Sequence, residues 1–286
     1  RDFCLSRGLG DVYKRQVVNE SAVPYSNAST VYNNGLDEKY AYGYDVAHLQ
    51  NAYLINAKKQ PDVVKQQIME HGAVGTSYTH YDNAADYDNN SYYDWQGIAS
   101  GGGGHAIMIV GWDDDYSKDN FTTSSKPANN GAWLIRNSWG TYFDYFWMSY
   151  ETYSLQDNVW VFDMSADDGL DNNYQLDGGL YTATIGYSKA ANIFHVSKKD
   201  GVDSETLKSV SLSCTQTADV GYTIEIYTDI TDTSNPASGT KHEEATTSGR
   251  TTYAGIYTIP LEHEVILNPD TYYAVVVTCL LYTSPS

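Results

Sequence analysis

The spacing of apolar residues divides the chain into two parts with different patterns. Before about residue 165, short continuous apolar runs predict buried strands, and the segment Pro61–Gly72 predicts one helix, with Val64 and Ile68 one turn apart. The predicted strands are Ala73–Tyr78, Ala106–Val110, Ala132–Ile135, Phe146–Tyr150 and Val159–Phe162. Residues 19–59 are polar and rich in turn formers, so we expect irregular structure there.

After about Asp171 the apolar residues alternate with polar ones. In Lys208–Cys214 every second residue from Val210 is apolar, which is the period of a half-buried strand. Further segments of this type are Ala191–Val196, Tyr222–Ile226, Ile256–Leu261 and Tyr272–Val277. A long run of such strands without a helical pattern predicts an antiparallel β-sandwich over residues 171–278, after a boundary in the acidic stretch Asp163–Asp177.

The two ends of the chain differ from the rest. The first 16 residues carry four of the 17 Lys and Arg residues. This segment and the last eight residues, 279–286, resemble translated sequencing-adapter read-through at the edges of reading frames assembled from metagenomes. We therefore expect residues 1–16 and 279–286 to be artefacts and the natural sequence to be a fragment that lacks both true termini.

Composition and charge exclude several classes of protein. With 41% hydrophobic and 19% charged residues, the chain is too apolar for a disordered acidic tail. A formal charge of −19 argues against nucleic acid or an anionic membrane surface as a partner. The longest apolar run, Ala106–Trp112, is too short to span a bilayer. The 27 tyrosines, together with many Asn, Ser, Thr and Gly residues, are typical of a secreted or cell-surface protein.

The three cysteines, Cys4, Cys214 and Cys279, fit no zinc or redox spacing, and we interpret them as small core residues or incidental ones. The acidic loop Asp113–Asp119 lacks the glycine and the distal glutamate of a calcium loop, so a solvated turn is favoured. The sequence therefore predicts no metal and no cofactor.

The candidate chemistry lies at His105 and Asn137. His105 immediately precedes one predicted strand, and Asn137 follows the next. If these strands pair antiparallel, both residues fall at the same end of the sheet. The asparagine carbonyl could then orient the imidazole while the other ring nitrogen serves a nucleophile. A neutral orienting residue suits a thiol, which ionises readily by itself.

The segments Gly104–Asp113 and Gly131–Gly140 resemble the histidine and asparagine motifs of papain-like cysteine peptidases. Residues 63–74 and Glu20–Tyr25 are similar to further segments of that family. The β-rich part that follows resembles the lectin-like domain found after this peptidase in some bacterial surface proteins. The implied fold class is α+β, with the C-terminal, β-rich portion of a papain-like peptidase domain at residues 17–165 and a lectin-like β-sandwich at residues 171–278.

The resemblance implies that His105 is the general base and acid, that Asn137 orients it, and that the Trp139 ring shields their hydrogen bond from water. The nucleophilic cysteine and the oxyanion-hole glutamine of the family would lie upstream of this chain, so we expect the chain alone to be inactive. Gly104 stands where the family usually has asparagine, and the usual glycine-containing turn after Gly140 is missing, so Trp139 or the next strand could be displaced.

Two functions remain open at this stage. The first is a papain-like endopeptidase that hydrolyses a protein or peptide substrate. The second is an inactive homologue that serves in surface adhesion or binds surface glycans through the β-sandwich. For the other six histidines the sequence favours surface or capping roles; they are His48, His71, His80, His195, His242 and His263.

Overall fold

The computed structural model describes residues 16–19, 21–27, 29–30, 45–98, 101–167, 169–174, 187–214 and 218–281. Most of the two suspected end segments, residues 1–15 and 282–286, lies outside the described residues, as does Glu20. The described part consists mainly of strands with the helix α2 (Pro61–His71) and several short 3-10 helices, so the expected α+β class is confirmed. Within this part, none of the helices combines the length and apolar character that crossing a membrane requires.

The chain forms two compact units. One contains Tyr53–Phe162, and the other contains the residues up to Ala52 together with Asp163–Ser286. Two strands, β2 (Asp45–Asn56) and β9 (Asn158–Ser165), have residues in both units. The division at residue 163 falls inside the acidic stretch Asp163–Asp177, where the sequence places a boundary. The limits of the two domains, residues 17–165 and 171–278, remain a prediction.

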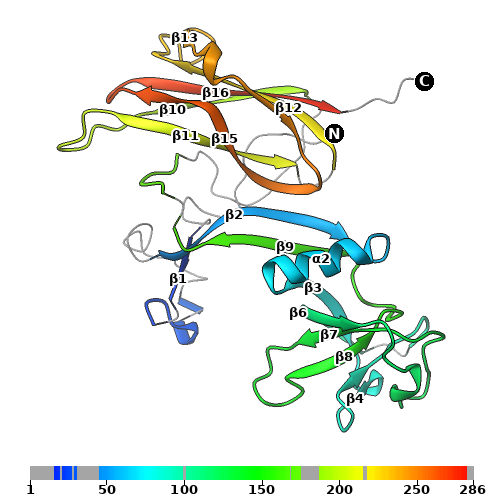
Figure 1. The fold of residues 1–286 in the computed structure, drawn as a ribbon. Helices are drawn as coiled ribbons and strands as arrows, with labels where there is room; N and C mark the ends of the chain where they lie inside the picture. Colours follow the sequence, from blue (N-terminus) through cyan, green and yellow to red (C-terminus); the bar gives the residue numbers. More distant parts are fainter. Residues whose placement is uncertain are drawn as a thin grey trace, which may run out of the picture. The chain divides into compact units, whose positions relative to one another are not determined.

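The unit of Tyr53–Phe162 is built on a sheet in which neighbouring strands follow the order β9-β3-β6-β7-β8-β5-β4 (Figure 1). Its further strands are β3 (Val74–His80), β4 (Ala85–Asp86), β5 (Ser91–Tyr92), β6 (Gly103–Asp113), β7 (Ala132–Arg136) and β8 (Tyr145–Ser149). The short 3-10 helices η3 (Asp82–Ala84) and η4 (Lys118–Asn120) lie in its loops. All these neighbours are antiparallel except β5 and β8, which run parallel.

The helix α2 forms where the sequence predicts it. Val64 and Ile68 are buried, and Gly72 ends the helix with a positive φ of 83°, where its N–H donates to the Ile68 carbonyl at 2.8 Å. On the same helix, Lys65 donates to the Asp114 carboxylate at 2.7 Å. This contact ties α2 to the acidic turn that follows β6, and it holds the pKa of Asp114 below its usual value.

The pairing of β6 with β7 determines the position of the candidate site. The two strands are antiparallel, as predicted, with Met108 opposite Arg136 and Ile109 opposite Ile135. The strand β6 is longer than predicted and is buried on one face only. Ile107 and Ile109 are buried, whereas Met108 is 46% exposed, so the run of apolar residues overstated the burial of this strand.

The expectation of irregular structure up to residue 59 is wrong for β2. Its polar residues made the strand hard to predict from the sequence, because their hydrogen-bond partners lie far along the chain. Gln50 donates to the Ser165 hydroxyl at 3.1 Å, and Asn51 donates to the Asp163 carboxylate at 2.8 Å. These hydrogen bonds satisfy amides that would otherwise be costly to bury partly within a sheet.

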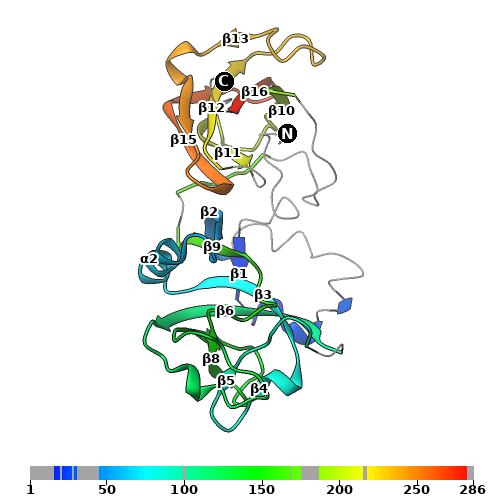
Figure 2. The ribbon, with the colours of Figure 1, turned by 90° about the vertical axis from the view of Figure 1, so that its right-hand side faces the viewer.

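The β-rich C-terminal part is a sandwich of short antiparallel strands, as the alternation predicts (Figure 2). Strands β11 and β15 pair on one side, and β10, β16, β12, β13 and β14 form the other sheet. Their bounds are β10 (Lys189–His195), β11 (Glu205–Cys214), β12 (Val220–Thr228), β13 (Thr240–Lys241), β14 (Thr247–Arg250), β15 (Ala254–Leu267) and β16 (Tyr272–Leu281). The core between them contains Leu212, Ile224, Ile226 and Val275.

The last strand extends beyond the predicted end of the sandwich at residue 278. Strand β16 runs through Cys279, which lies opposite Tyr222 of β12 and is 7% exposed. Cys214 is fully buried in the same core. The remaining short elements of this unit are β1 (Gln16–Val18), η1 (Tyr25–Asn27) and η5 (Glu243–Ala245), of which β1 pairs with β2.

Candidate active site

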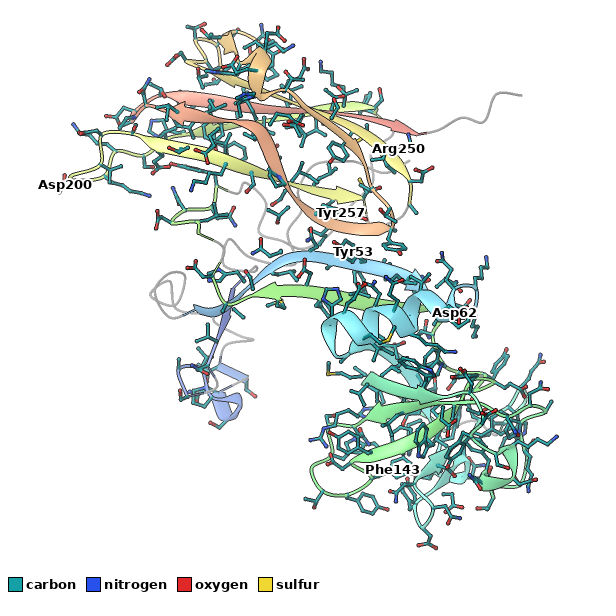
Figure 3. All side chains as sticks on the ribbon, in the orientation of Figure 1. Tyr53, Asp62, Phe143, Asp200, Arg250 and Tyr257 are labelled. Carbon is teal, nitrogen blue, oxygen red and sulfur yellow. The ribbon has the colours of Figure 1, made fainter. Side chains whose placement is uncertain are left out.

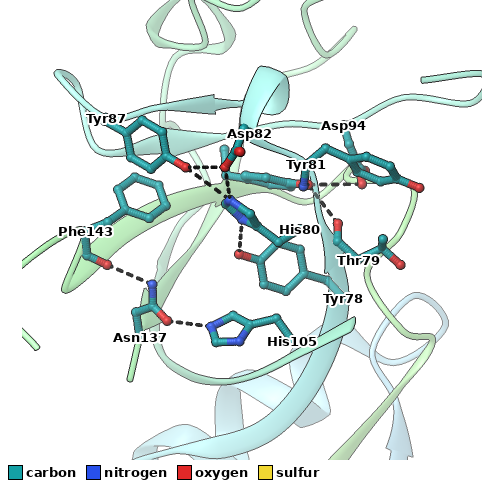
Figure 4. Close-up of polar contacts among 11 residues, drawn as sticks. Tyr78, Thr79, His80, Tyr81, Asp82, Tyr87, Asp94, His105, Asn137 and Phe143 are labelled. Atoms are coloured by element: carbon teal, nitrogen blue, oxygen red, sulfur yellow. Dashed lines mark hydrogen bonds and ion pairs between the residues drawn. The ribbon is translucent and has the colours of Figure 1, made fainter. Parts of the chain in front are cut away.

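The structure brings His105 and Asn137 into direct contact. His105 lies on β6 opposite Tyr78 of β3, and Asn137 directly follows the last residue of β7. The Nε2 atom of His105 and the Oδ1 atom of Asn137 are 2.7 Å apart (Figure 4). This contact follows from the antiparallel register of β6 and β7, which places both residues at the same end of the strand pair.

Three further hydrogen bonds hold the buried side chain and backbone of Asn137. Its Nδ2 atom donates to the Phe143 carbonyl at 3.0 Å, and its Oδ1 atom accepts from the Ser138 N–H at 2.8 Å. Its own backbone N–H donates to the Asp144 carbonyl at 2.8 Å. These partners determine that the carbonyl end of the amide faces His105.

The orientation of the amide selects one tautomer of His105. An asparagine carbonyl oxygen only accepts hydrogen bonds, so the Nε2 atom of His105 carries the proton that it donates. In the neutral ring the Nδ1 atom then keeps its lone pair and can accept a proton. A histidine in this state is suited to serve as a general base toward a group placed beside Nδ1.

The turn between β7 and β8 replaces the glycine-containing turn that the family resemblance led us to expect. Phe143 adopts a positive φ of 50°, which is unusual for a residue with a bulky side chain. Its ring is buried and stacks on Phe146, with ring centroids 4.3 Å apart. Phe143 is labelled in Figure 3. Arg136 and Asp144 form an ion pair across the base of the turn. Packing therefore holds a backbone conformation that glycine would adopt without strain.

The third predicted residue, Trp139, lies against the imidazole of His105. Their ring centroids are 4.9 Å apart with an angle of 34° between the planes. The indole is 38% exposed, so it lies at the surface of this unit rather than in the core, and it covers part of the imidazole. Trp139 thus contacts the His105 ring despite the altered turn.

His80 also lies near the site, although the sequence favours a surface or capping role for it. His80 is the last residue of β3, and both of its ring nitrogens have partners. Nδ1 is 2.9 Å from the Tyr78 hydroxyl, and Nε2 is 3.3 Å from Asp82 and 3.1 Å from the Tyr87 hydroxyl (Figure 4). The predicted strand Ala73–Tyr78 ends two residues short of His80. The spacing of Tyr78 and His80 was the available signal, because a strand that continues to residue 80 places both on one face of the sheet.

Comparison with known families adds evidence that is independent of this geometry. The chain matches the family model described as papain family cysteine protease over residues 9–159, just over half of its length. The chain belongs to this family. Residues 173–284 match the model of a lectin-like domain, so the expected order of the two domains is confirmed.

Two solved structures of the clostridial cysteine protease Cwp84 are similar to this chain. One is a cysteine-to-alanine variant after propeptide cleavage, with 27% identity, a TM-score of 0.67, and coverage of 96% of this chain and 66% of the other. The second contains the cysteine protease and lectin-like domains of Cwp84, a surface layer associated protein of Clostridium difficile. It shows 26% identity, a TM-score of 0.66, and coverage of 96% of this chain and 59% of the other.

A curated relative is the cathepsin B-like cysteine proteinase 3 of Caenorhabditis elegans. It is 31% identical over 104 residues, which are 36% of this chain and 24% of that protein. The chain thus spans less than two thirds of the length of the relatives that it matches.

Proposed function

We propose that this chain carries the histidine and asparagine portion of a papain-like cysteine endopeptidase, followed by a lectin-like domain. The 2.7 Å contact between His105 and Asn137 is the observation that carries the proposal. The nucleophilic cysteine comes from sequence upstream of this chain. The protein acts on protein or peptide substrates and is secreted or held at the cell surface, in keeping with the surface layer association of Cwp84.

In this mechanism the Nδ1 atom of His105 accepts the proton of the cysteine thiol, which gives a thiolate and imidazolium pair. The thiolate attacks the carbonyl carbon of the scissile peptide, and the imidazolium donates its proton to the departing amine. Water then hydrolyses the thioester, which releases the acid and regenerates the thiol. Throughout, Asn137 holds the ring through Nε2, so that Nδ1 remains directed at the reacting atoms.

Activity measurements on two forms of the protein test this assignment. The 286-residue chain alone is expected to hydrolyse neither casein nor a fluorogenic peptide, because it lacks the nucleophile. The gene extended upstream is expected to encode a glutamine followed by Cys-x-x-Cys-Trp and to yield an active enzyme. In that enzyme His105→Ala should abolish turnover, while His71→Ala, a change at an exposed histidine of the same unit, should preserve it. Turnover by the 286-residue chain, or full activity of H105A, would contradict the proposal.

A second candidate function is an inactive surface protein that binds glycans through the lectin-like domain. Gly104, at a position where the family usually has asparagine, favours it. Serine or glycine in place of the first upstream cysteine would support this function over the peptidase. Glycan-array binding that survives deletion of residues 17–165 would support glycan recognition by the lectin-like domain, without excluding the peptidase.

A further inference from the structure

A second histidine, His80, lies beside the His105–Asn137 pair on the neighbouring strand. His80 lies opposite Gly103 of β6, two residues before His105, while His105 lies opposite Tyr78. The two imidazoles therefore belong to adjacent strands at the same end of the sheet. His80 is largely buried, with 11% of its side chain exposed.

The ring of His80 is in contact with the ring that covers His105. The centroids of His80 and Trp139 are 4.9 Å apart and their planes are nearly perpendicular, at 82°. On the same indole, the contact with His105 is tilted and also has a centroid distance of 4.9 Å. Tyr92 stacks against His80 at 5.5 Å. His80 thus links the buried aromatic side chains of this unit to the partly exposed indole.

Hydrogen bonds fix the rotation of the His80 ring. The Tyr78 hydroxyl lies 2.9 Å from Nδ1, and Asp82 accepts from the Tyr87 hydroxyl at 3.0 Å while it also contacts Nε2. Burial raises the pKa of Tyr78, so its hydroxyl keeps the proton that it donates to Nδ1. The Nε2–H group of a neutral His80 then donates toward Asp82. A ring with a partner on each nitrogen has a single orientation.

The neutral state of His80 suits a neighbour of His105. Burial lowers the pKa of His80, the contact with Asp82 offsets this in part, and the nearby His105 lowers it further. At neutral pH His80 therefore adds no positive charge beside an imidazole that must become an imidazolium during the reaction.

We propose that His80 is a positioning residue for the His105–Asn137 pair, and that it acts by holding the indole of Trp139 against the imidazole of His105. This inference rests on the proposed function for its catalytic meaning, but the contact itself can be tested without turnover. An aromatic ring is needed at this position, because the edge contact with the indole is a contact between rings.

The test measures ring-current shifts of His105 by NMR in the 286-residue chain. The ring-proton signals of His105 are assigned from their loss in H105Q, and W139A defines their position without the indole. We expect H80A to shift the His105 signals most of the way toward the W139A position. H80F, which keeps the ring contact, should leave them near the wild-type position. His71→Ala serves as a control that leaves them unchanged.

The proposal would be overturned if the His105 ring-proton signals stay at their wild-type positions in H80A but are displaced in W139A. If H80A loses its dispersed backbone spectrum, H80F and H80Q decide, because the proposal requires H80Q to be displaced and H80F to be retained. If the peptidase assay shows no activity, the NMR result on the contact between His80 and Trp139 still stands. If the enzyme is active but H80A leaves the His105 signals unshifted, the positioning role of His80 is wrong and the proposed peptidase function is not.

Discussion

The backbone carbonyl of Phe143 accepts a hydrogen bond of 3.0 Å from the side-chain amide of Asn137. Phe143 offers this carbonyl from a backbone conformation with φ at 50°, which strains any residue with a Cβ atom. The buried ring stacked on Phe146 supplies the packing that holds the conformation. The orientation of the Asn137 side chain is therefore tied to aromatic packing in the turn that follows it.

Two substitutions at Phe143 distinguish the contribution of its buried ring to stability from the cost of its strained backbone. Phe143→Ala should destabilise the unit of residues 53–162 by roughly 3 kcal/mol, since a buried aromatic ring is lost. Phe143→Gly should be more stable than Phe143→Ala by about 1 kcal/mol, because glycine adopts a positive φ freely. Hydrogen exchange of backbone amides in β7 and β8 measures both free energies of opening.

The neighbouring residue Tyr142 provides the matched control. It is 60% exposed, and its φ is not positive. Tyr142→Ala should change the free energy by less than about 0.5 kcal/mol, and Tyr142→Gly should be the less stable of the two. The same order of Ala and Gly at both positions would rule out strain at Phe143.

The lowered pKa of His80 predicts a loss of stability in mild acid. Its titratable neighbours are Tyr78, Asp82, Tyr87, Tyr92 and His105, of which Asp82 alone favours the charged ring. Below about pH 6.5 the unfolded state binds a proton that the folded state does not yet bind, so stability falls until the pH reaches the folded pKa. The loss is about 1.4 kcal/mol for each unit by which the pKa is lowered.

The variant His80→Gln removes this titration. Its free energy of unfolding should change less between pH 7 and pH 5 than that of the wild type, measured by hydrogen exchange in β3 and β6. Equal losses in the two proteins would show that His80 does not titrate below its unfolded value.

The end of α2 gives a prediction about backbone conformation alone. Gly72 has a φ of 83°, and a Cβ atom there would meet no atom within 4 Å. Gly72→Ala should therefore cost about 1 kcal/mol through strain without a clash, and Gly72→Asn should cost less. Gly103→Ala is the control, because its Cβ also meets no atom but its φ is not positive. A similar effect of both alanine variants on thermal unfolding would contradict this account.

In the sandwich, Glu205 of β11 binds the residues Asn172 and Tyr174, which precede β10 in the chain. It accepts hydrogen bonds from Tyr174 at 2.7 Å and Asn172 at 3.1 Å, and it pairs with Lys199 at 3.0 Å. Burial favours the neutral acid, but these partners outweigh it and lower the pKa of Glu205. Its stabilising contribution is therefore present above about pH 4.5 and is lost as the pH falls through the folded pKa.

Glu205→Gln should lower the free energy of unfolding of the sandwich at pH 7 by roughly 2 kcal/mol, since the hydrogen bonds to a charged acceptor are lost. Urea unfolding at pH 7 measures the change. The exposed Glu264 on β15 is the control, and Glu264→Gln should have little effect. No difference between the two variants would show that the contacts of Glu205 add nothing to stability.

The parts of the structure that the sequence predicts are those in which neighbouring residues carry the signal. The pairing of β6 and β7 follows from two apolar runs that flank a polar loop, and it brings His105 to Asn137. The strand β2 could not be predicted, because Gln50 and Asn51 find their partners more than 100 positions away. The hydrogen-bond partners of His80 are close to it in the sequence, but its ring contact with Trp139 joins two distant segments and could not be predicted.

The positive φ at Phe143 also could not be predicted from the sequence. Local preference places glycine or asparagine in such a conformation, and the ring contacts of Phe143 with Phe146 and Tyr87 account for an aromatic residue there. Tertiary packing thus determines the turn, while local pattern determines the strands that it joins.

Three of the four polar contacts of Asn137 come from Ser138, Phe143 and Asp144, all within the next seven positions of the chain. An insertion or deletion inside this short hairpin would consequently misalign the amide at once. By contrast, none of those three contacts involves the polar segment between β6 and β7, so a change of length there would leave the hydrogen bonds within the hairpin in place.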